Sequence, residues 1–389
     1  MTAAAAQPLP SIVEWSPGLP RGSCLPPGAA SGLALQPTGL LTGEAAARAV
    51  AGGTAMRLAG GPLAFSSCVV TLPALRGPVR AAAGLAEIVD WAAGEGATLA
   101  GAVHHRLDRI ARERPPFAGL SLDRARLIGV VNVTPDSFSD GGERFAAGDA
   151  IAAGRALAKA GADLIDVGGE STRPGAAPVD AAIECGRVLP VIRALAADGI
   201  AVSVDTRRAG VTAAAIEAGA VVVNDVSALG FDPASAATVA AGGAAAILMH
   251  MLGEPATMQD APAYGDAPYE VFRWLDARAA AAREAGIPAG SIAVDPGIGF
   301  GKNDDHNAAI LAAIGLFHAT GRPVVLGASR KSFIGRISRG EAPGARLPGS
   351  LAAVAAAALQ GVQLFRVHDV AETRQALAVL ARIGGLGVT

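Results

Sequence analysis

The chain has 389 residues, enough for a large α/β barrel together with a smaller domain. Hydrophobic residues make up 51% and charged residues 17%, which excludes an intrinsically disordered chain. The formal net charge of −2 provides no general attraction to nucleic acid or to an anionic membrane. Any anionic ligand must therefore be bound by a local cluster of basic side chains.

The first third of the chain lacks regular alternation of strands and helices. Residues 1–40 are rich in Pro, Gly and Ala, so we expect poor order at the extreme start. Further along, helix-like stretches lie at Glu44–Ala51 and Ala82–Ala93, and β-like runs lie at Ala64–Leu72 and Gly96–Val103. This pattern fits either a small α/β module or extra elements packed on a larger domain. Pro115 and Pro116 mark a linker.

From Leu127 onward the chain repeats one unit, in which a short β-rich run is followed by an Ala-rich helical stretch. The eight predicted strands are Leu127–Thr134, Leu164–Gly168, Ala201–Thr206, Val221–Ser227, Ala245–Met251, Ile292–Gly297, Pro323–Ser329 and Val362–His368. The predicted helices include Asp149–Ala160, Asp180–Ala197, Arg208–Ala218, Tyr269–Ala285, Asn307–Thr320 and Gly349–Gln360. Such alternation predicts a (β/α)8 (TIM) barrel over residues 119–389, with an open doubly wound sheet as the alternative. Residues 1–118 are then an N-terminal extension or small domain.

The sequence predicts neither a membrane span nor a secretory signal. The most apolar stretch, 234–252, is interrupted by Thr238 and His250, and we interpret it as a helix followed by a buried strand. No basic residue precedes Arg21, so the start does not resemble a signal peptide. The cysteines are scattered without a CxxC pair, which argues against a disulfide framework and a thiolate zinc site: Cys24, Cys68 and Cys185. We therefore predict a cytoplasmic protein.

Polar side chains stand at or just after the ends of all eight predicted strands, where the active sites of such barrels lie. They include Asn132, Asp166, Asp205, Asn224, His250, Asp295, Lys331, Arg366 and His368. A single Asp or Asn at such a position often only caps the next helix. A ring of them costs too much desolvation to persist without a ligand or a dense hydrogen-bond network. The ring therefore predicts an active site.

The ring contains two kinds of groups. One set offers acceptors, an amide and a single cation, which suit a flat heterocycle: Asp205, Asn224, Asp295 and Lys331. A second set suits an anion: Arg173, Arg366 and His368, with Asn132 nearby. Arg366 and His368 are two residues apart on one strand and face the same side. Because phosphate groups favour the loops after the last two strands of such barrels, the residues predict an enzyme for a heterocycle that carries phosphate.

The glycine-rich segment Gly297–Lys302 resembles a nucleotide-binding loop only superficially. Asn303 follows Lys302 where a P-loop requires Ser or Thr, and the spacing of the glycines does not meet the dinucleotide fingerprint. A tight turn between a strand and a helix explains the glycines better.

At these residues the chain resembles the dihydropteroate synthases of the pterin-binding barrel superfamily. The matching blocks, in chain order, are 132–142 (NVTPDSFSDGG), 169–175 (GESTRPG), 203–206 (SVDT), 224–227 (NDVS), 248–251 (LMHM), 295–302 (DPGIGFGK), 329–332 (SRKS) and 366–370 (RVHDV). The resemblance covers about residues 119–389 and does not extend to the N-terminal third. Small departures stand at Ile298 and Ala328, where relatives often carry larger residues.

The resemblance implies a role for each matching residue. Pterin would be held by Asp205, Asn224, Asp295 and Lys331, with Met249 and Phe300 lining its slot. Pyrophosphate would be held by Arg173, Arg366 and His368, and Asn132 would ligate Mg²⁺ together with the substrate's oxygens and water. The p-aminobenzoate would be bordered by Thr172 and Ser332, helped by mobile loops at 135–142 and 171–176. The main catalytic groups would be Asp205, Lys331, Arg366 and His368.

The implied reaction condenses 6-hydroxymethyl-7,8-dihydropterin pyrophosphate with p-aminobenzoate to give 7,8-dihydropteroate and diphosphate. Relatives are usually homodimers, so the resemblance implies a homodimer as well. Two alternatives are a methyltransferase that uses methyltetrahydrofolate and a non-catalytic pterin-binding homologue. The methyltransferase would not need the 171–174 block (STRP) or the 329–332 block (SRKS), and the chain contains both. A non-catalytic homologue would be favoured if a residue of the anion site were missing, and none is missing.

Overall fold

The centre of the larger part of the molecule is a closed barrel of short parallel strands. The computed structural model describes residues 14–22, 28–73, 78–134, 143–171, 179–255 and 257–384, with the backbone alone at 143–146. Within these residues an eight-stranded sheet has the order β11-β10-β9-β8-β7-β6-β13-β12. A parallel bridge between Val294 and Val324 joins the sheet's two ends and closes the barrel. The strands are β6 Arg126–Asn132, β7 Leu164–Gly168, β8 Val202–Asp205, β9 Val222–Asp225, β10 Ala245–Met249, β11 Ile292–Asp295, β12 Val325–Leu326 and β13 Leu364–Val367.

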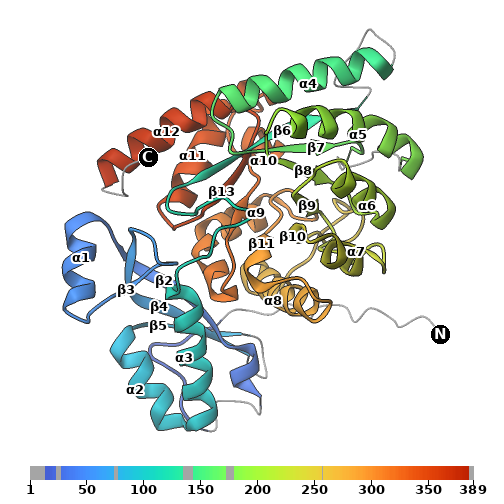
Figure 1. Cartoon of the computed structure of the whole chain (residues 1–389). Coiled ribbons are helices and arrows are strands. Elements are labelled where there is room, and N and C mark those ends of the chain that lie inside the picture. The colour runs from blue at the N-terminus through green and yellow to red at the C-terminus, as the bar shows by residue number, and fades with distance from the viewer. Residues whose placement is uncertain are drawn as a thin grey trace.

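Helices alternate with these strands and lie outside them, as Figure 1 shows. They are α4 Glu143–Lys159, α5 Ala181–Ala197, α6 Ala209–Glu217, α7 Ser235–Gly242, α8 Ala267–Glu284, α9 Asp304–Ala312, α10 Ser332–Arg336, α11 Leu347–Ala358 and α12 Val370–Gly384. Apolar side chains such as Leu195 of α5 and Val211 of α6 pack against strand residues such as Val204. Each such side chain contributes about 1.5–3 kcal/mol when fully buried. The predicted (β/α)8 barrel is confirmed.

The N-terminal part folds around a separate five-stranded sheet with the order β1-β5-β4-β2, in which β3 also pairs with β4. Its elements are β1 Glu14–Trp15, β2 Ala34–Leu41, α1 Gly43–Ala51, β3 Met56–Arg57, β4 Ala64–Leu72, β5 Val79–Gly84, α2 Leu85–Glu95 and α3 Ala97–Ala111. Pro37 lies within β2, and β2 is an edge strand that pairs only with β4, so no second neighbour needs the missing N–H. This part is a small α/β module.

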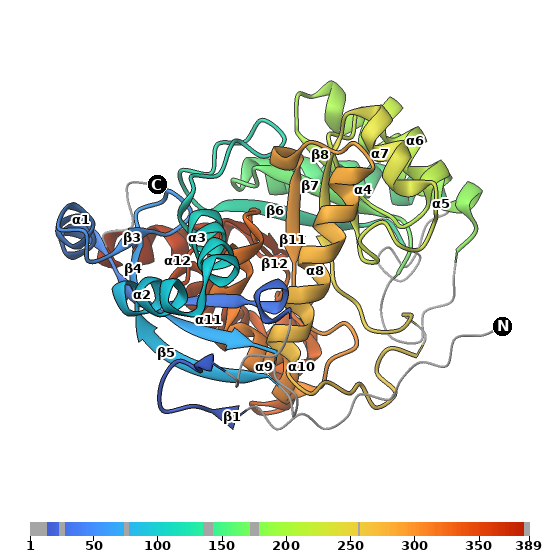
Figure 2. The same ribbon diagram turned by 90° about the horizontal axis from the view of Figure 1, so that it is seen from below.

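The two parts share one hydrophobic core. Leu33 and Phe65 of the N-terminal part belong to the same buried cluster as Phe272 of α8 and Phe317 of the 3-10 segment Ile314–Thr320. Ion pairs supplement this packing, because Arg106 and Arg109 of α3 both contact Asp276 of α8, at 2.7 and 2.9 Å. Figure 2 shows the N-terminal sheet beside α8.

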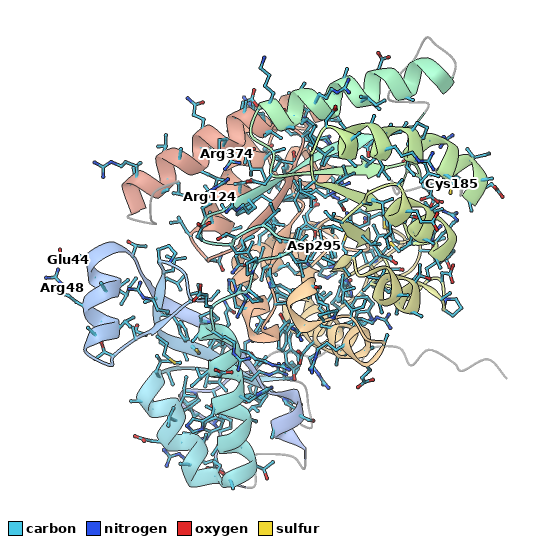
Figure 3. All side chains as sticks on the ribbon, in the orientation of Figure 1. Glu44, Arg48, Arg124, Cys185, Asp295 and Arg374 are labelled. Carbon is cyan, nitrogen blue, oxygen red and sulfur yellow. The ribbon has the colours of Figure 1, made fainter. Side chains whose placement is uncertain are left out.

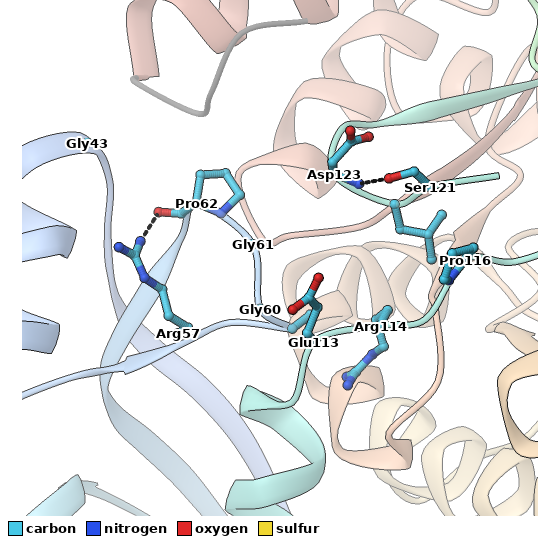
Figure 4. A pocket seen from close by; sticks show the side chains of 12 residues that line it. Gly43, Arg57, Gly60, Gly61, Pro62, Glu113, Arg114, Pro116, Ser121 and Asp123 are labelled. Carbon is cyan, nitrogen blue, oxygen red and sulfur yellow. Dashed lines mark hydrogen bonds between the residues drawn. The ribbon is translucent and has the colours of Figure 1, made fainter.

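A hairpin ahead of β6 closes the amino end of the barrel. Phe117 pairs with Leu120, and the Phe117 side chain is fully buried against residues from the strand starts, such as Leu164 and Val222. Next to this hairpin, a pocket of about 610 Å³ lies where the two parts meet (Figure 4). It is lined by Gly43, Arg57, Ala59, Gly60, Gly61, Pro62, Glu113, Arg114, Pro116, Ser121, Leu122 and Asp123. The pocket is therefore at the opposite end of the barrel from the polar ring.

Several element predictions need correction. Gly96–Val103 is not a strand, because Ala97–Ala111 forms α3, whose buried residues Leu99, Val103, Leu107 and Ile110 show helical spacing only over the whole segment. Residues 82–84 belong to β5, so α2 begins three residues later than the predicted helix. The predicted helix 307–320 divides into α9 and the 3-10 segment, and β12 has only two residues. The expected disorder at the extreme start falls on residues outside the described part, at least through residue 13.

Candidate active site

The polar side chains of the strand ends meet at the carboxyl end of the barrel. Parallel strands in register bring them together, since Asn132 of β6 pairs with Gly168 of β7, Gly168 with Asp205 of β8, and Asp205 with Asn224 of β9. Asp295 and Arg366 lie on either side of Gly327. A Cβ added at Gly327 would be 3.5 Å from Asp295 Oδ2 and 3.9 Å from Arg366 Cβ. Figure 3 shows Asp295 in the middle of the barrel.

Arg366 is the centre of a charged network inside this end of the barrel. Its Nε donates to Asp166 Oδ2 at 2.6 Å, and its Nη2 donates to Asp205 Oδ2 at 2.9 Å. Asp166 is fully buried on β7, and the same Oδ2 also accepts a hydrogen bond from Asn224 Nδ2 at 3.0 Å. Asp166 therefore orients both the amide and the guanidinium, while its buried Oδ1 has no hydrogen-bond partner within the described residues.

The network shifts the ionisation of its members. Burial lowers the pKa of Arg366, but the carboxylates of Asp166 and Asp205 outweigh burial and hold that pKa above its ordinary value. Burial raises the pKa of Asp205 to about 7; the charge of Arg366 opposes the rise and that of Asp166 adds to it. Arg366 therefore stays charged, while Asp205 gains or loses its charge near neutral pH.

Asp295 and Lys331 form the other side of the mouth. Asp295 Oδ1 accepts a hydrogen bond from the Gly297 N–H at 2.7 Å, and burial raises the pKa of Asp295 despite this bond. Lys331 Nζ lies 4.0 Å from the centroid of the Phe300 ring, which is a cation–π contact. Burial lowers the pKa of Lys331 to about 8, and the charge of Arg366 lowers it further while Asp295 opposes this.

The turn after β12 is held by residues that follow β13. Ser329 Oγ accepts a hydrogen bond from the His368 N–H at 3.2 Å and lies 3.1 Å from His368 Nδ1. Arg330 has a left-handed backbone (φ 57) and donates from Nε and Nη2 to the two carboxylate oxygens of Asp369. Burial and the neighbouring Arg366 lower the pKa of His368 to about 4, so its imidazole is neutral at neutral pH.

The glycine-rich segment is a tight turn that approaches the backbone after β10. Gly297, Gly299 and Gly301 all have positive φ, which confirms the turn interpretation. Behind the turn, Lys302 is fully buried, and its Nζ bonds to His250 Nδ1 at 2.9 Å, to Phe300 O at 3.0 Å and to His250 O at 3.3 Å. Burial lowers the pKa of Lys302 to about 7. Lys302 is thus committed to holding the turn.

Replacing Gly297 by alanine should destabilise this turn strongly. A Cβ at Gly297 would lie 1.9 Å from the carbonyl oxygen of His250, and φ 68 adds a cost of about 1–2 kcal/mol for any other residue. We expect a clearly lower melting temperature for Gly297→Ala. Gly186→Ala is the matched control, since no atom lies within 4 Å of its added Cβ. Equal melting temperatures for the two variants would contradict the prediction.

The sequence of residues 128–368 matches the family model of pterin-binding enzymes. The dihydropteroate synthase of Escherichia coli (strain K12) is 44% identical over 262 residues, which cover 67% of this chain and 92% of that enzyme. The chain belongs to the dihydropteroate synthase family. Two Xanthomonas albilineans dihydropteroate synthase structures are also similar: one with 4-aminobenzoic acid (46% identical, TM-score 0.65) and one with 7,8-dihydropteroate (43%, TM-score 0.63). Each structural match covers 69% of this chain and 97% of the other.

The family membership predicted from the motifs is thereby confirmed. The E. coli dihydropteroate synthase is matched over nearly its whole length by two thirds of this chain. The matched family model begins at residue 128, within β6, and thus lies entirely within the barrel. The N-terminal α/β module is therefore an addition to the part shared with that relative.

The remaining predicted site residues of this dihydropteroate synthase family member differ from one another in burial. Met249 is buried at the end of β10, and Asn132 is partly exposed at the end of β6. Ser332 is exposed and accepts a hydrogen bond from Arg336 Nη1 at 2.8 Å. Thr172 and Arg173, with the loop segments 135–142 and 172–176, lie outside the described residues, so their predicted roles stay predictions.

The sequence analysis assigned no role to three residues that support this dihydropteroate synthase site. Asp166 holds Arg366 and Asn224, Ser329 holds His368, and Lys302 holds the glycine-rich turn. Asp166 offered a usable signal, because it is the single charge within the apolar strand β7, and a buried carboxylate requires partners. Lys302 gave no such signal, because its bonds to His250 and to the Phe300 carbonyl depend on the tertiary structure.

Proposed function

We propose that this chain joins 6-hydroxymethyl-7,8-dihydropterin pyrophosphate to p-aminobenzoate, releasing diphosphate and forming 7,8-dihydropteroate. The family membership supports this reaction, as do the two related structures with 4-aminobenzoic acid and 7,8-dihydropteroate. The observation that carries the proposal here is the convergence of Asp205, Asn224, Asp295 and Lys331 around the guanidinium of Arg366.

The pterin would occupy the side of the mouth that offers both acceptors and donors. Asp205 and Asp295 supply carboxylate oxygens for ring N–H groups, and Asn224 supplies an amide that Asp166 already orients. Phe300 and Met249 would line the slot for the flat ring. Lys331 contacts the Phe300 ring and interacts electrostatically with Asp295. Its ammonium would therefore donate to a polar edge of the pterin bound between these residues.

The proposed reaction breaks the bond between the exocyclic carbon of the pterin and the diphosphate oxygen, and the diphosphate leaves with the electron pair. The p-aminobenzoate nitrogen then forms the new bond to that carbon and loses a proton. Arg366 and His368, with Arg173, would bind the departing diphosphate, and Ser332 with Thr172 would border the p-aminobenzoate. Asp205 would stabilise the electron-poor pterin that remains. No protein nucleophile takes part.

Mg²⁺ fits the oxygen donors beside this site. Asn132 Oδ1 and Asp205 Oδ2 flank Gly168, since a Cβ added there would lie 3.7 Å from each. Hard oxygen ligands of this kind suit Mg²⁺, which commonly keeps water and substrate phosphate as its other ligands. We propose Asn132 as the protein ligand. Neutralisation of the diphosphate charge is the chemistry that the ion supplies when bound.

The proposed reaction is tested by mixing purified protein with the pterin pyrophosphate, p-aminobenzoate and Mg²⁺, and measuring diphosphate and dihydropteroate together. We expect equal amounts of both products, and little of either when Mg²⁺ is chelated. Lys331→Ala and Asp205→Ala should weaken pterin binding in calorimetry. Absence of Mg²⁺-dependent dihydropteroate from folded protein would overturn the proposal.

The reaction should show a bell-shaped pH dependence of kcat/KM for the pterin substrate. Asp205 loses its charge as the pH falls through about 7, and Lys331 loses its charge as the pH rises through about 8. In Lys331→Arg the alkaline limb should disappear, because a guanidinium keeps its proton. An acid limb that persists unchanged in Asp205→Asn would belong to the substrate and contradict the assignment.

We further propose that the chain works as a homodimer in the cytoplasm, with residues 1–118 as an added domain and 119–389 as the catalytic domain. Cys68 and Cys185 are both free thiols, which agrees with a reducing compartment. No helix in the described part of the chain has the length and apolarity that a membrane crossing needs. Analytical ultracentrifugation tests the dimer, since a single species of monomer mass would exclude it.

A further inference from the structure

The N-terminal module contacts the barrel at the start of α8, where the chain leaves the active-site end. Arg80 of β5 and Asp266, the N-cap residue of α8, form an ion pair with Nη2 and Oδ2 2.5 Å apart. Both side chains are largely buried. One turn along, Tyr269 Oη donates to Gly32 O at 2.6 Å. Asp266 Oδ1 at the same time caps α8 by accepting from the Tyr269 N–H.

A long irregular segment, residues 250–266, connects β10 to this point and is called here the β10–α8 segment. Its described residues form no helix or strand, whereas connections of this kind usually span about 2–6 residues. Such a long connection requires contacts elsewhere to hold one conformation. Asp266 ends the segment, so the ion pair with Arg80 anchors its last residue to the N-terminal module.

The β10–α8 segment in turn holds the glycine-rich turn of the active site. Gln259 Nε2 donates to Gly299 O at 2.6 Å, and Tyr264 Oη donates to Gly301 O at 2.9 Å. These bonds lie on either side of Phe300, whose ring contacts the Lys331 ammonium. A continuous series of contacts therefore leads from Arg80 through Asp266 and the β10–α8 segment to the proposed pterin slot.

We propose that the N-terminal module is a positioning element for pterin binding, with Arg80 as the positioning residue. It acts through Asp266 on the β10–α8 segment and so on the backbone that carries Phe300. The inference deepens the proposed function and rests on it, because Phe300 is taken to line the pterin slot. It predicts that a residue of the added module affects the affinity for one substrate and spares the other.

A second contact between the same two parts provides a matched control. Asp276 of α8 pairs with both Arg106 and Arg109, ten residues beyond Asp266 and therefore about 15 Å further along the helix. Asp276→Asn removes two ion pairs, whereas Arg80→Met removes one. General loosening of the interface predicts a larger effect for Asp276→Asn. Positioning of the turn predicts the opposite order.

The experiment compares the full-length wild type with Arg80→Met, Arg80→Lys and Asp276→Asn, each below its own melting temperature. Calorimetry measures pterin pyrophosphate binding, steady-state kinetics measures both KM values, and hydrogen exchange follows residues 257–266 and 297–303. In Arg80→Met we expect the pterin Kd and KM to rise about fivefold, with kcat and the KM for p-aminobenzoate within about twofold. In the absence of ligand, hydrogen exchange at residues 297–303 should be faster in Arg80→Met than in the wild type. Arg80→Lys should recover part of each change, and Asp276→Asn should show little.

Unchanged exchange at 297–303 and unchanged pterin Kd in Arg80→Met overturn the inference, as does a larger effect in Asp276→Asn. These outcomes are separable from failure of the proposed function. If the wild type does not bind the pterin pyrophosphate, the proposed function is wrong, and the inference, which rests on it, is overturned as well. The exchange experiment without ligand reports on the contact itself in either case.

Discussion

Replacing Arg366 by methionine should lower kcat/KM for the pterin substrate by about a thousandfold. The substitution leaves Asp166 and Asp205 without their shared cation and removes a proposed contact to the departing diphosphate. Losing one group that stabilises developing charge costs about 2.7–4 kcal/mol in the transition state. A loss of about 4 kcal/mol in the transition state corresponds to about three powers of ten in rate. Because Arg366 touches the carboxylates of the pterin side and is proposed to grip diphosphate, both pterin affinity and diphosphate release should suffer.

Arg374→Met is the matched control for this variant. Arg374 has similar side-chain exposure, 26% against 21% for Arg366, and also pairs with a carboxylate, Asp163. Asp163 directly precedes β7 and so lies at the amino end of that strand, away from the active site at the carboxyl end. We therefore expect kcat/KM of Arg374→Met to stay within about threefold of the wild type. Adding Asp166→Asn to Arg366→Met should recover melting temperature by removing one unpaired charge. A kcat/KM for Arg366→Met as high as that of Arg374→Met would show that the network is not needed for the reaction.

Replacing Asp166 by alanine should reduce kcat/KM about a hundredfold, although we place no substrate contact on this residue. The change removes the acceptor for Arg366 Nε and for Asn224 Nδ2, and each buried polar group left unpaired costs about 1–3 kcal/mol. The charge of Asp166 also helps to raise the pKa of Asp205. The acid limb of the pH profile should therefore move to lower pH, which simple loss of stability would not cause.

Asp166→Asn separates position from charge. The amide keeps an oxygen that can accept from Arg366 or Asn224, so we expect it to recover part of the rate lost in Asp166→Ala. The acid limb should still move, since the neutral amide no longer repels an ionised Asp205. If the acid limb stays in place in both variants, Asp166 does not influence the ionisation of Asp205.

The sequence was sufficient for the barrel because its strands are short, buried and separated by helices of regular period. Runs such as Leu164–Gly168 need no tertiary information to be identified, and parallel strands can close only in a few ways. Predictions were least accurate in the N-terminal module. There, Gly96–Val103 was too short to distinguish a strand from the first half of α3, and β2 was concealed by Pro37. Local pattern is ambiguous over such lengths.

For the site, the sequence determined which groups stand at the strand ends, since the alternation of side chains fixes which residues face the barrel mouth. The partners of those groups depend on contacts across the barrel. Arg366 and Asp166 are 200 residues apart, and Lys302 meets His250 from another strand. Only the closed tertiary structure decides that Asp166 orients both Arg366 and Asn224. It also decides that Lys302 holds the glycine-rich turn. The same holds for Arg80, because the sequence does not show that this arginine of the N-terminal module pairs with Asp266 at the start of α8.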